Sequence, residues 1–248
     1  FLLHSHHPRS LPLPYTTLFR YKWIEYFQAE HNIKARAVSQ EQPAQIKQIL
    51  QLCRQFFPNR NTSVKPVQVL IIGIPNVGKS SIINTLSGRI IAKVGNEPAV
   101  TKRQQKIILE NGIQLMDTPG FLWPQIHNEN TGYRLAITGA IKSTAMEYDD
   151  VALYAADYFL KAYPDLLMQR YKLKTLPEND MDALESIGRN RGCLLAGGKV
   201  TLHKASELLL NEFRAKQLGA ISLATPQMEE ANMKAMENKQ TETKQPLK

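Results

Sequence analysis

The stretch VQVLIIGIPNVGKSSI, residues 67–82, decides how this chain of 248 residues folds. Its first part, Val67 to Ile72, is mostly apolar and β-branched, which is typical of a buried strand in a parallel sheet. The loop that follows, Gly73 to Ser80, matches the pattern G-x-x-x-x-G-K-[ST], and an apolar helical pattern follows the loop. A strand, a glycine-rich loop and a helix in this order predict a phosphate-binding loop in an α/β fold.

The residue types of this loop suit the binding of a nucleoside triphosphate. Glycines let consecutive backbone N–H groups point at one phosphate, and the helix directs its positive N-terminal end at the same place. Lys79 is expected to reach the β- and γ-phosphate oxygens, and the Ser80 hydroxyl to bind Mg²⁺. The nucleotide-binding residues predicted in this loop are Asn76, Val77, Gly78, Lys79, Ser80 and Ser81.

A second motif, DTPG at 117–120, follows a strand predicted at 113–116. A carboxylate at that end of a strand can hold the Mg²⁺ shell, so Asp117 is predicted to bind the metal. The Gly120 N–H is predicted to meet the γ-phosphate. Thr101 lies between the two motifs, where a loop threonine could bind Mg²⁺ only with the γ-phosphate present and so act as a switch. The predicted catalytic residues are Lys79, Thr101 and Gly120.

Outside these motifs, the hydrophobic pattern predicts helices and strands in alternation and then helices alone. A helix is expected at 21–31, a short strand at 33–39, a helix from about Pro43, and a further strand at 105–109. From Gly132 onward the strand signals fade. The pattern predicts an α/β doubly wound sheet followed by a small α-helical domain.

The composition favours a partner that carries phosphates. Lys and Arg number 31 against 22 Asp and Glu, a net charge of +9, and between residues 60 and 106 eight basic residues face one acid, Glu97. No run of apolar residues approaches the 18 or so that a membrane-spanning helix needs. Cys53 and Cys193 are too far apart for a zinc ribbon. The sequence predicts a soluble cytoplasmic monomer without membrane partners.

The first twenty residues contain three of the six histidines and no acid. A targeting segment would share this character, but three prolines interrupt any amphipathic helix, and no apolar core with a cleavage site follows. Residues 14–20, PYTTLFR, resemble the in-frame translation of a sequencing-adapter oligonucleotide. We therefore expect residues 1–20 to be non-native and the natural start to lie further upstream.

The two phosphate motifs together resemble those of a translation-factor-class GTPase. Such proteins read guanine with Asn-Lys-x-Asp well after DTPG, yet the only later Asn-Lys is Asn238-Lys239, followed by Gln240 and Thr241. Instead, the pattern predicts a helix, a strand and a helix before the phosphate loop. This order resembles a circularly permuted GTPase, in which the base-reading part comes first.

The resemblance is specific to the bacterial ribosome biogenesis GTPase A family. KWIEYF at 22–27 resembles the helix after that family's base-reading motif, and GRNRGC at 188–193 and FRAKQLG at 213–219 resemble its C-terminal helical domain. The resemblance implies binding of GTP and GDP, hydrolysis of GTP with Mg²⁺, and a role with the large ribosomal subunit and its rRNA. The Asn-Lys-x-Asp motif is expected just before residue 21, so this chain is expected to be truncated and weakened.

Two residues bear on the rate of hydrolysis. Many GTPases place a glutamine after the DTPG-type motif to orient the attacking water, whereas this chain has Phe121. Slow intrinsic hydrolysis, stimulated by the ribosome, is therefore expected. Asn76 resembles the residue that helps to hold K⁺ near the phosphates in potassium-dependent GTPases; a simple turn asparagine is the alternative interpretation.

Basic residues gather without an intervening acid between Glu185 and Glu207. Together with flexible glycines, such a cluster suits contacts with rRNA phosphates, although a solvated surface is the alternative. The predicted RNA contacts are Arg189, Arg191, Lys199 and Lys204.

The motifs and the hydrophobic pattern divide the chain into four regions. They are a non-native segment at 1–20, a partial permuted GTPase domain at 21–131, a helical RNA- or ribosome-binding domain at 132–225 and a disordered tail at 226–248. Two other functions remain open on the residues alone. One is an adenine-specific P-loop ATPase, and the other is an RNA-binding module with an inert nucleotide site.

Overall fold

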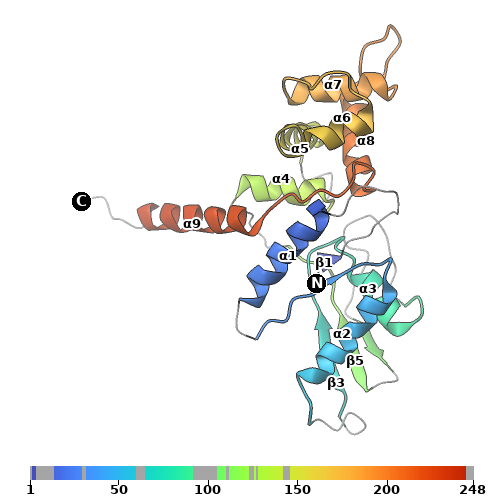
Figure 1. The fold of residues 1–248 in the computed structure, drawn as a ribbon, viewed down its shortest axis with the longest axis vertical. Helices are drawn as coiled ribbons and strands as arrows, with labels where there is room; N and C mark the ends of the chain where they lie inside the picture. The colour runs from blue at the N-terminus through green and yellow to red at the C-terminus, as the bar shows by residue number, and fades with distance from the viewer. Residues whose placement is uncertain are drawn as a thin grey trace. The chain divides into compact units, whose positions relative to one another are not determined.

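The computed structural model describes residues 2–3, 14–29, 32–59, 65–91, 105–109, 112–122, 126, 128–141 and 146–243. The chain divides into two compact units (Figure 1). The first, which we call the GTP-fold unit, comprises residues 1–12 and 27–124, and the second, the helical unit, comprises residues 13–26 and 125–248. The division at 124–125 falls a few residues before the boundary predicted at 131–132.

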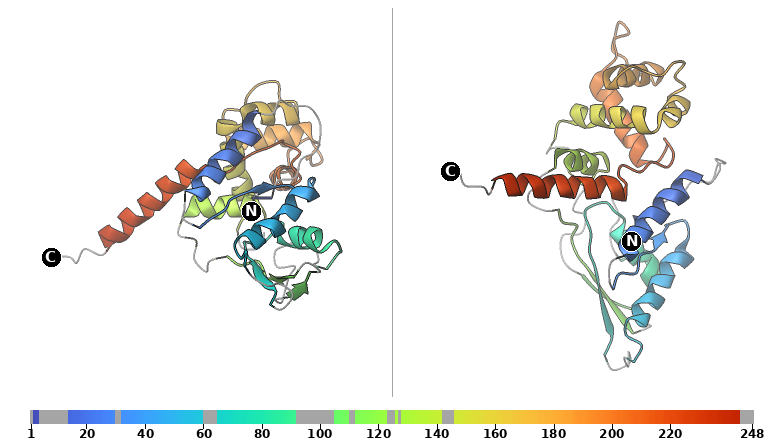
Figure 2. Two further views of the ribbon diagram at one scale, coloured as in Figure 1. Left: turned by 60° about the horizontal axis from the view of Figure 1, so that its bottom comes forward. Right: turned by 60° about the vertical axis from the view of Figure 1, so that its left-hand side comes forward.

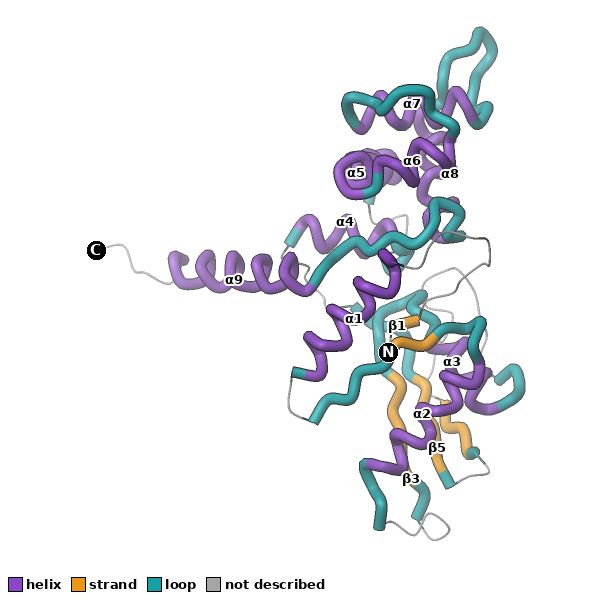
Figure 3. The backbone as a smooth tube through the Cα atoms, viewed as in Figure 1, coloured by secondary structure: helices purple, strands orange, loops and turns teal. Residues whose placement is uncertain are grey.

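The GTP-fold unit contains a three-stranded sheet in the order β3-β5-β4 (Figure 3). β3 (Val67–Ile71) runs parallel to β5 (Ile113–Asp117), and β4 (Gln105–Ile108) runs antiparallel to β5. Ile71 lies opposite Asp117, so the ends of the two parallel strands meet at one edge. The three strands predicted in this part of the chain are confirmed, and the carboxyl ends of β3 and β5 place the two phosphate motifs side by side.

Two helices and the sheet share the core of the GTP-fold unit. α2 (Pro43–Gln55) begins with a proline in its first turn, and α3 (Lys79–Ser87) follows the phosphate loop. The buried apolar residues of this core are Val38, Ile46, Ile49, Val67, Ile82, Ile83, Leu86, Ile107, Leu109, Ile113 and Leu115. β2 (Ala37–Val38) lies within the strand predicted at 33–39 and pairs with β1 (Leu2–Leu3) in a separate two-stranded ladder.

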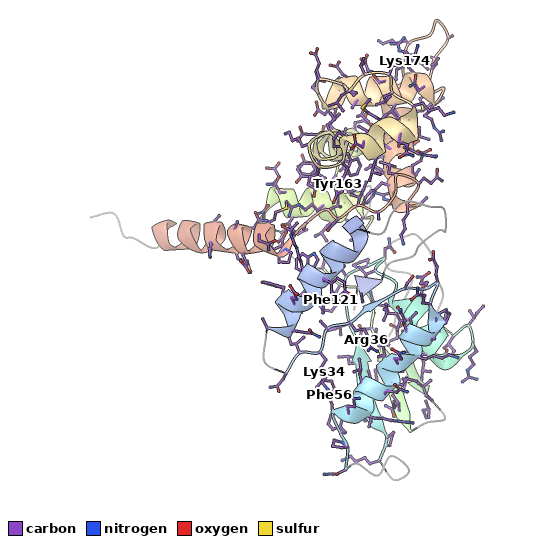
Figure 4. All side chains as sticks on the ribbon, in the orientation of Figure 1. Lys34, Arg36, Phe56, Phe121, Tyr163 and Lys174 are labelled. Carbon is purple, nitrogen blue, oxygen red and sulfur yellow. The ribbon has the colours of Figure 1, made fainter. Side chains whose placement is uncertain are left out.

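The end of α2 differs from the expected pattern. Phe56 and Phe57 continue the apolar period of the sequence, but the helix ends at Gln55 and both rings are about half exposed, at 49% and 47%. Instead of packing in the core, the Phe56 ring makes a cation–π contact with Lys34, whose Nζ lies 5.0 Å from the ring centroid (Figure 4). The apolar period extends beyond the helix because it records side-chain type, not the point where the backbone turns.

The helical unit is built around α5. Its helices are α1 (Pro14–Gln28), α4 (Glu129–Ile137), α5 (Tyr148–Ala162), α6 (Pro164–Tyr171), α7 (Asp180–Asn190), α8 (Leu202–Arg214) and α9 (Pro226–Thr243). α5 packs against α4, α6, α7 and α8. Phe159 on α5 is fully buried, and the centroid of its ring lies 5.5 Å from that of Phe213 on α8. The helical character expected after Gly132 is confirmed, although α4 begins slightly earlier.

The segment 226–248, expected to be disordered, begins with helix α9 (Figure 2). Its residues are mainly Met, Glu, Ala, Lys and Gln, which are strong helix formers, and Pro226 fits the first turn. Arg134 on α4 donates a 2.6 Å hydrogen bond to Glu229 and ties the start of α9 to α4. Low hydrophobicity argued for disorder in the sequence but did not exclude a polar helix. Among the described residues, no helix is long and apolar enough to cross a membrane.

Candidate nucleotide-binding site

The phosphate loop takes backbone conformations that explain its residue types. Gly73 and Gly78 have φ values of +156° and +89°, in a region that side chains with a Cβ rarely occupy. Gly78 is also the residue from which α3 begins, so the loop leads directly to the helix N-terminus. Asn76 has φ +61°, a left-handed conformation that asparagine tolerates better than most residues. The backbone therefore accounts for the Asn at this position without any ion.

Lys79 lies inside the loop that precedes it. Its Nζ donates to the carbonyl oxygens of Gly73 at 3.0 Å and Ile74 at 2.7 Å. An ammonium group has three N–H donors, so one is left for a phosphate oxygen. Partial burial lowers the pKa of Lys79, and the nearby Asp117 carboxylate opposes that effect. The loop carbonyls thus hold the ammonium group at the mouth of the predicted phosphate site.

The DTPG motif packs against the same loop. The Thr118 hydroxyl donates a 2.8 Å hydrogen bond to Ile71 O at the end of β3. At Gly120 a Cβ atom would lie only 2.8 Å from both Cα and N of Pro75 and 3.0 Å from Lys79 Nζ. Only a glycine fits this approach without displacing the phosphate loop. The two predicted halves of the site, 73–80 and 117–120, therefore come together.

Asp117 is the buried acid of the site. It ends β5, is 0% exposed, and lies close enough to Lys79 to raise that residue's pKa. Ser80 is half-buried in the first turn of α3. A serine hydroxyl and a carboxylate are oxygen ligands of the kind that Mg²⁺ prefers, so the donor types here fit this ion.

The remaining predicted site residues have different outcomes. Val77 is partly exposed at 39%, and Ser81 is half-buried in α3. Thr101, the predicted switch threonine, lies outside the described residues. Phe121 is 52% exposed directly after the DTPG motif, and its phenyl ring has no group to hold a water by hydrogen bonding (Figure 4).

The predicted RNA contacts divide into two kinds. Arg189, Lys199 and Lys204 are exposed and form no ion pair with a residue in the described part of the chain. Arg191, in contrast, is bound by the Glu212 carboxylate, which also accepts two 2.8 Å hydrogen bonds from Arg170. Sequence reasoning missed this buried acid because an isolated Glu in an amphipathic helix carries no signal of its partners.

Comparison with known proteins decides the family. A family model described as "50S ribosome-binding GTPase" matches residues 68–187. Ribosome biogenesis GTPase A of Priestia megaterium is 41% identical over 213 residues, which is 83% of this chain and 74% of that protein. The chain belongs to the ribosome biogenesis GTPase A family. It is a GTPase of ribosome biogenesis.

Solved structures of the same family agree with the fold. GNP-bound YlqF from T. maritima matches with a TM-score of 0.56 and 26% identity over 83% of this chain and 75% of that one. The GDP-bound structure of TM YlqF gives 0.57 and 25% over 84% and 77%. These likenesses confirm the P-loop GTPase fold with an added helical domain. They favour the guanine-nucleotide enzyme over the ATPase and the inert RNA-binding module.

Proposed function

We propose that this member of the ribosome biogenesis GTPase A family hydrolyses GTP at the junction of the phosphate loop and the DTPG motif. Lys79 binds the β- and γ-phosphates, while Ser80 and Asp117 hold Mg²⁺, joined by Thr101 when the γ-phosphate is present. Mg²⁺ held by these oxygen ligands would supply charge neutralisation at the phosphates. The observation that supports the proposal is the close approach of Gly120 to Pro75 and Lys79, which brings the DTPG motif against the phosphate loop.

Hydrolysis by the chain alone is slow under this proposal. Phe121 cannot orient the attacking water by hydrogen bonding, so a partner or an ion completes the site. Asn76 is exposed on the phosphate loop, where its side-chain oxygen can serve a K⁺ ion. The left-handed backbone at Asn76 would select asparagine even without an ion, so the potassium dependence of hydrolysis decides between the two roles.

The partner that we propose is the large ribosomal subunit in the bacterial cytoplasm, with the chain acting as a monomer. The description of the matching family model and the names of the relatives support this partner. The helical unit supplies the RNA contacts through Arg189, Lys199 and Lys204, whose side chains are exposed. Phosphate contacts of this kind make binding weaken steeply with salt.

A titration with GDP and ADP tests the nucleotide assignment. We expect Mg²⁺ to strengthen GDP binding and GDP to bind severalfold more tightly than ADP. The preference is expected to be small because residues 1–248 contain no Asn-Lys-x-Asp motif to read the base. Equal affinities for the two nucleotides would contradict guanine selection. Binding that is independent of Mg²⁺ would contradict the roles of Ser80 and Asp117.

Turnover measured with purified large subunits tests the partner. GTP hydrolysis should rise severalfold when the subunits are added in potassium buffer and should rise less in sodium buffer of the same ionic strength. A rise that is equal in both buffers removes the role of Asn76 in holding K⁺. A rate that large subunits leave unchanged removes the proposed partner and leaves the nucleotide site intact.

A further inference from the structure

The segment between α7 and α8 forms a hairpin, residues 191–201, that is fixed by its own backbone. Leu194 and Val200 form an antiparallel bridge, and the Leu195 N–H donates to Lys199 O at 2.8 Å. Figures 1 and 2 show the connection after α7 as a loop that extends away from the helices of its unit. The tip of this hairpin is therefore displayed to solvent.

The base of the hairpin rests tightly on α7. A Cβ atom at Gly188 would lie 2.5 Å from Val200 Cγ1 and 3.1 Å from Ala205 Cβ, so only a glycine leaves room for the hairpin. The Cys193 N–H donates to Gly188 O at 2.8 Å, and the Thr201 N–H donates to Cys193 O at the same distance. These contacts orient the tip before any partner binds, which lowers the entropy cost of binding.

The tip presents two leucines to water. The exposed fractions of Leu194 and Leu195 are 39% and 53%. Gly197 and Gly198, which close the turn with positive φ values, have no atom within 4 Å of the position of an added Cβ. Adjacent exposed leucines on a fixed support add nothing to the core of the unit, but they offer an apolar contact to a partner.

Three exposed cations lie in the hairpin or in the helices that flank it. Arg189, Lys199 and Lys204 are all exposed, and no acidic residue occurs between Glu185 and Glu207. Burial raises the pKa of the Cys193 thiol, and the charge of Lys204 opposes that effect in part. Lys204 therefore lies near the base of the hairpin. Exposed leucines together with exposed cations complement a nucleic acid, which offers the apolar faces of its bases beside charged phosphates. An apolar protein groove without acidic residues would leave the cations unpaired.

We propose that Leu194 and Leu195 form an apolar wedge that docks against an unstacked base in a bulge or loop of RNA, while Arg189, Lys199 and Lys204 contact the flanking phosphates. The inference rests on the proposed RNA contact of the helical unit and adds the structural class of RNA that the unit selects. Leucine side chains wedge between base steps in proteins that bind the minor groove of DNA, and proteins read RNA mainly where its bases are unstacked.

Two RNA hairpins of the same length and charge test the wedge, with the full chain as the protein. One is fully paired, and the other carries a single bulged fluorescent adenine analogue. The wild-type chain should bind the bulged RNA about tenfold more tightly, as expected for burial of two partly exposed leucines, and should change the fluorescence of the bulged base. The double variant Leu194→Ser, Leu195→Ser should bind both RNAs alike and leave the fluorescence unchanged.

Two matched variants separate the wedge from charge. Lys199→Ala should weaken binding of both RNAs equally and reduce the salt slope by about one. Met233→Ser removes an apolar side chain that is 47% exposed on α9 and should change neither property. Far-ultraviolet circular dichroism should be the same for all of these chains, because each substituted side chain is exposed.

The outcomes distinguish the wedge from the function on which it rests. RNA binding with a salt slope but without preference for the bulge would overturn the wedge alone, as would a double variant that keeps the preference. No binding to either RNA would contradict the RNA contact of the helical unit as well. If the double variant kept its RNA binding but lost affinity for whole large subunits, the tip would contact a ribosomal protein, and the proposal would be wrong.

Discussion

Among the residues that the structure describes, each of the two units buries one carboxylate, and the surroundings of the two differ. Glu212 in the helical unit is 5% exposed and is enclosed by the guanidinium groups of Arg170 and Arg191. Asp117 in the GTP-fold unit is 0% exposed and lies at the end of β5, beside the lysine of the phosphate loop. One acid joins helices to one another, whereas the other stands at a sheet edge where a ligand is expected.

The difference separates a charge that supports the fold from one that we propose supports chemistry. A buried ion pair with complete hydrogen bonding holds its partners in a fixed arrangement, and removing one member is costly. Glu212 joins α8 to α6 and to the end of α7 in this way. At Asp117 the neighbouring cation belongs to the phosphate loop, so the bound nucleotide and Mg²⁺ are expected to share in balancing its charge.

Removal of the Glu212 carboxylate should have the largest effect. Glu212→Ala leaves the partly exposed guanidinium groups of Arg170 and Arg191 without the buried carboxylate that pairs with both, so we expect a loss of about 3 kcal/mol in the free energy of unfolding. Urea unfolding of the chain followed by circular dichroism measures this loss. Glu207→Ala, on an exposed position of the same helix, is the matched control and should cost less than about 0.5 kcal/mol. Nucleotide affinity should be unchanged, and a large fall in affinity would contradict the separation of the two roles.

Removal of the Lys79 ammonium group should act on the ligand instead. Lys79→Ala removes charge-assisted hydrogen bonds to phosphate and should weaken GDP binding by about a hundredfold, which is about 2.7 kcal/mol. Calorimetric titration measures the affinity, with Lys47→Ala on the exposed side of α2 as the control. If Lys79→Ala kept its affinity for GDP, the proposed position of the phosphate site would be wrong. If it mainly lost stability, Lys79 would have a structural role like that of Glu212.

The sequence indicated the candidate nucleotide site but not the Glu212 network, for a physical reason. Phosphate binding imposes local requirements, so residues 73–80 carry a recognisable pattern by themselves. The contact of Gly120 with Pro75 follows from the parallel pairing of β3 and β5, which the apolar strands indicated. The Glu212 network instead joins residues 42 and 21 positions apart on different helices, and no local pattern records such a pairing.

The same reasoning explains two places where the sequence pattern and the structure differ. Phe56 and Phe57 fit the helical period but lie beyond α2, because backbone termination and side-chain type are separate properties. α9 occupies much of the segment expected to be disordered, because strong helix formers and the Arg134–Glu229 pair stabilise a polar helix. Low hydrophobicity was not sufficient evidence for disorder.

Arg214 offers a test of intermediate size within the helical unit. Its guanidinium group donates to Ile137 O at 2.9 Å, Ala136 O at 2.8 Å and the Tyr148 hydroxyl at 2.7 Å. It therefore caps the last carbonyls of α4. Arg214→Ala should cost about 2 kcal/mol in the free energy of unfolding, because charged hydrogen bonds to buried groups are lost. Arg189→Ala is the exposed control, and equal stability of the two variants would contradict the capping role.

The pH dependence of stability provides a further test of Glu212. Burial raises its pKa, but the hydrogen bonds and charge of Arg170 outweigh burial, so the net pKa in the folded chain is below the ordinary 4.5. A depressed carboxyl pKa gives stability that is complete above the unfolded pKa and is lost as the pH falls through the folded value. Unfolding free energies measured below about pH 5 should fall more steeply for the wild type than for Glu212→Gln, which cannot titrate. Parallel curves would contradict a charged Glu212.

The smallest effect should come from an ion pair that is exposed. Lys161 and Asp157 lie one turn apart on α5, with Nζ and a carboxylate oxygen 2.7 Å apart and side chains 74% and 46% exposed. The distance resembles that in the Glu212 network, but water screens both charges, so Lys161→Ala should cost about 0.4 kcal/mol or less. Raising the salt concentration should remove this difference while leaving most of the Glu212→Ala effect, because buried pairs are screened much less. If the exposed pair proved as costly as the buried network, distance and not enclosure would govern these charges, and the contrast between Glu212 and Asp117 would lose its basis.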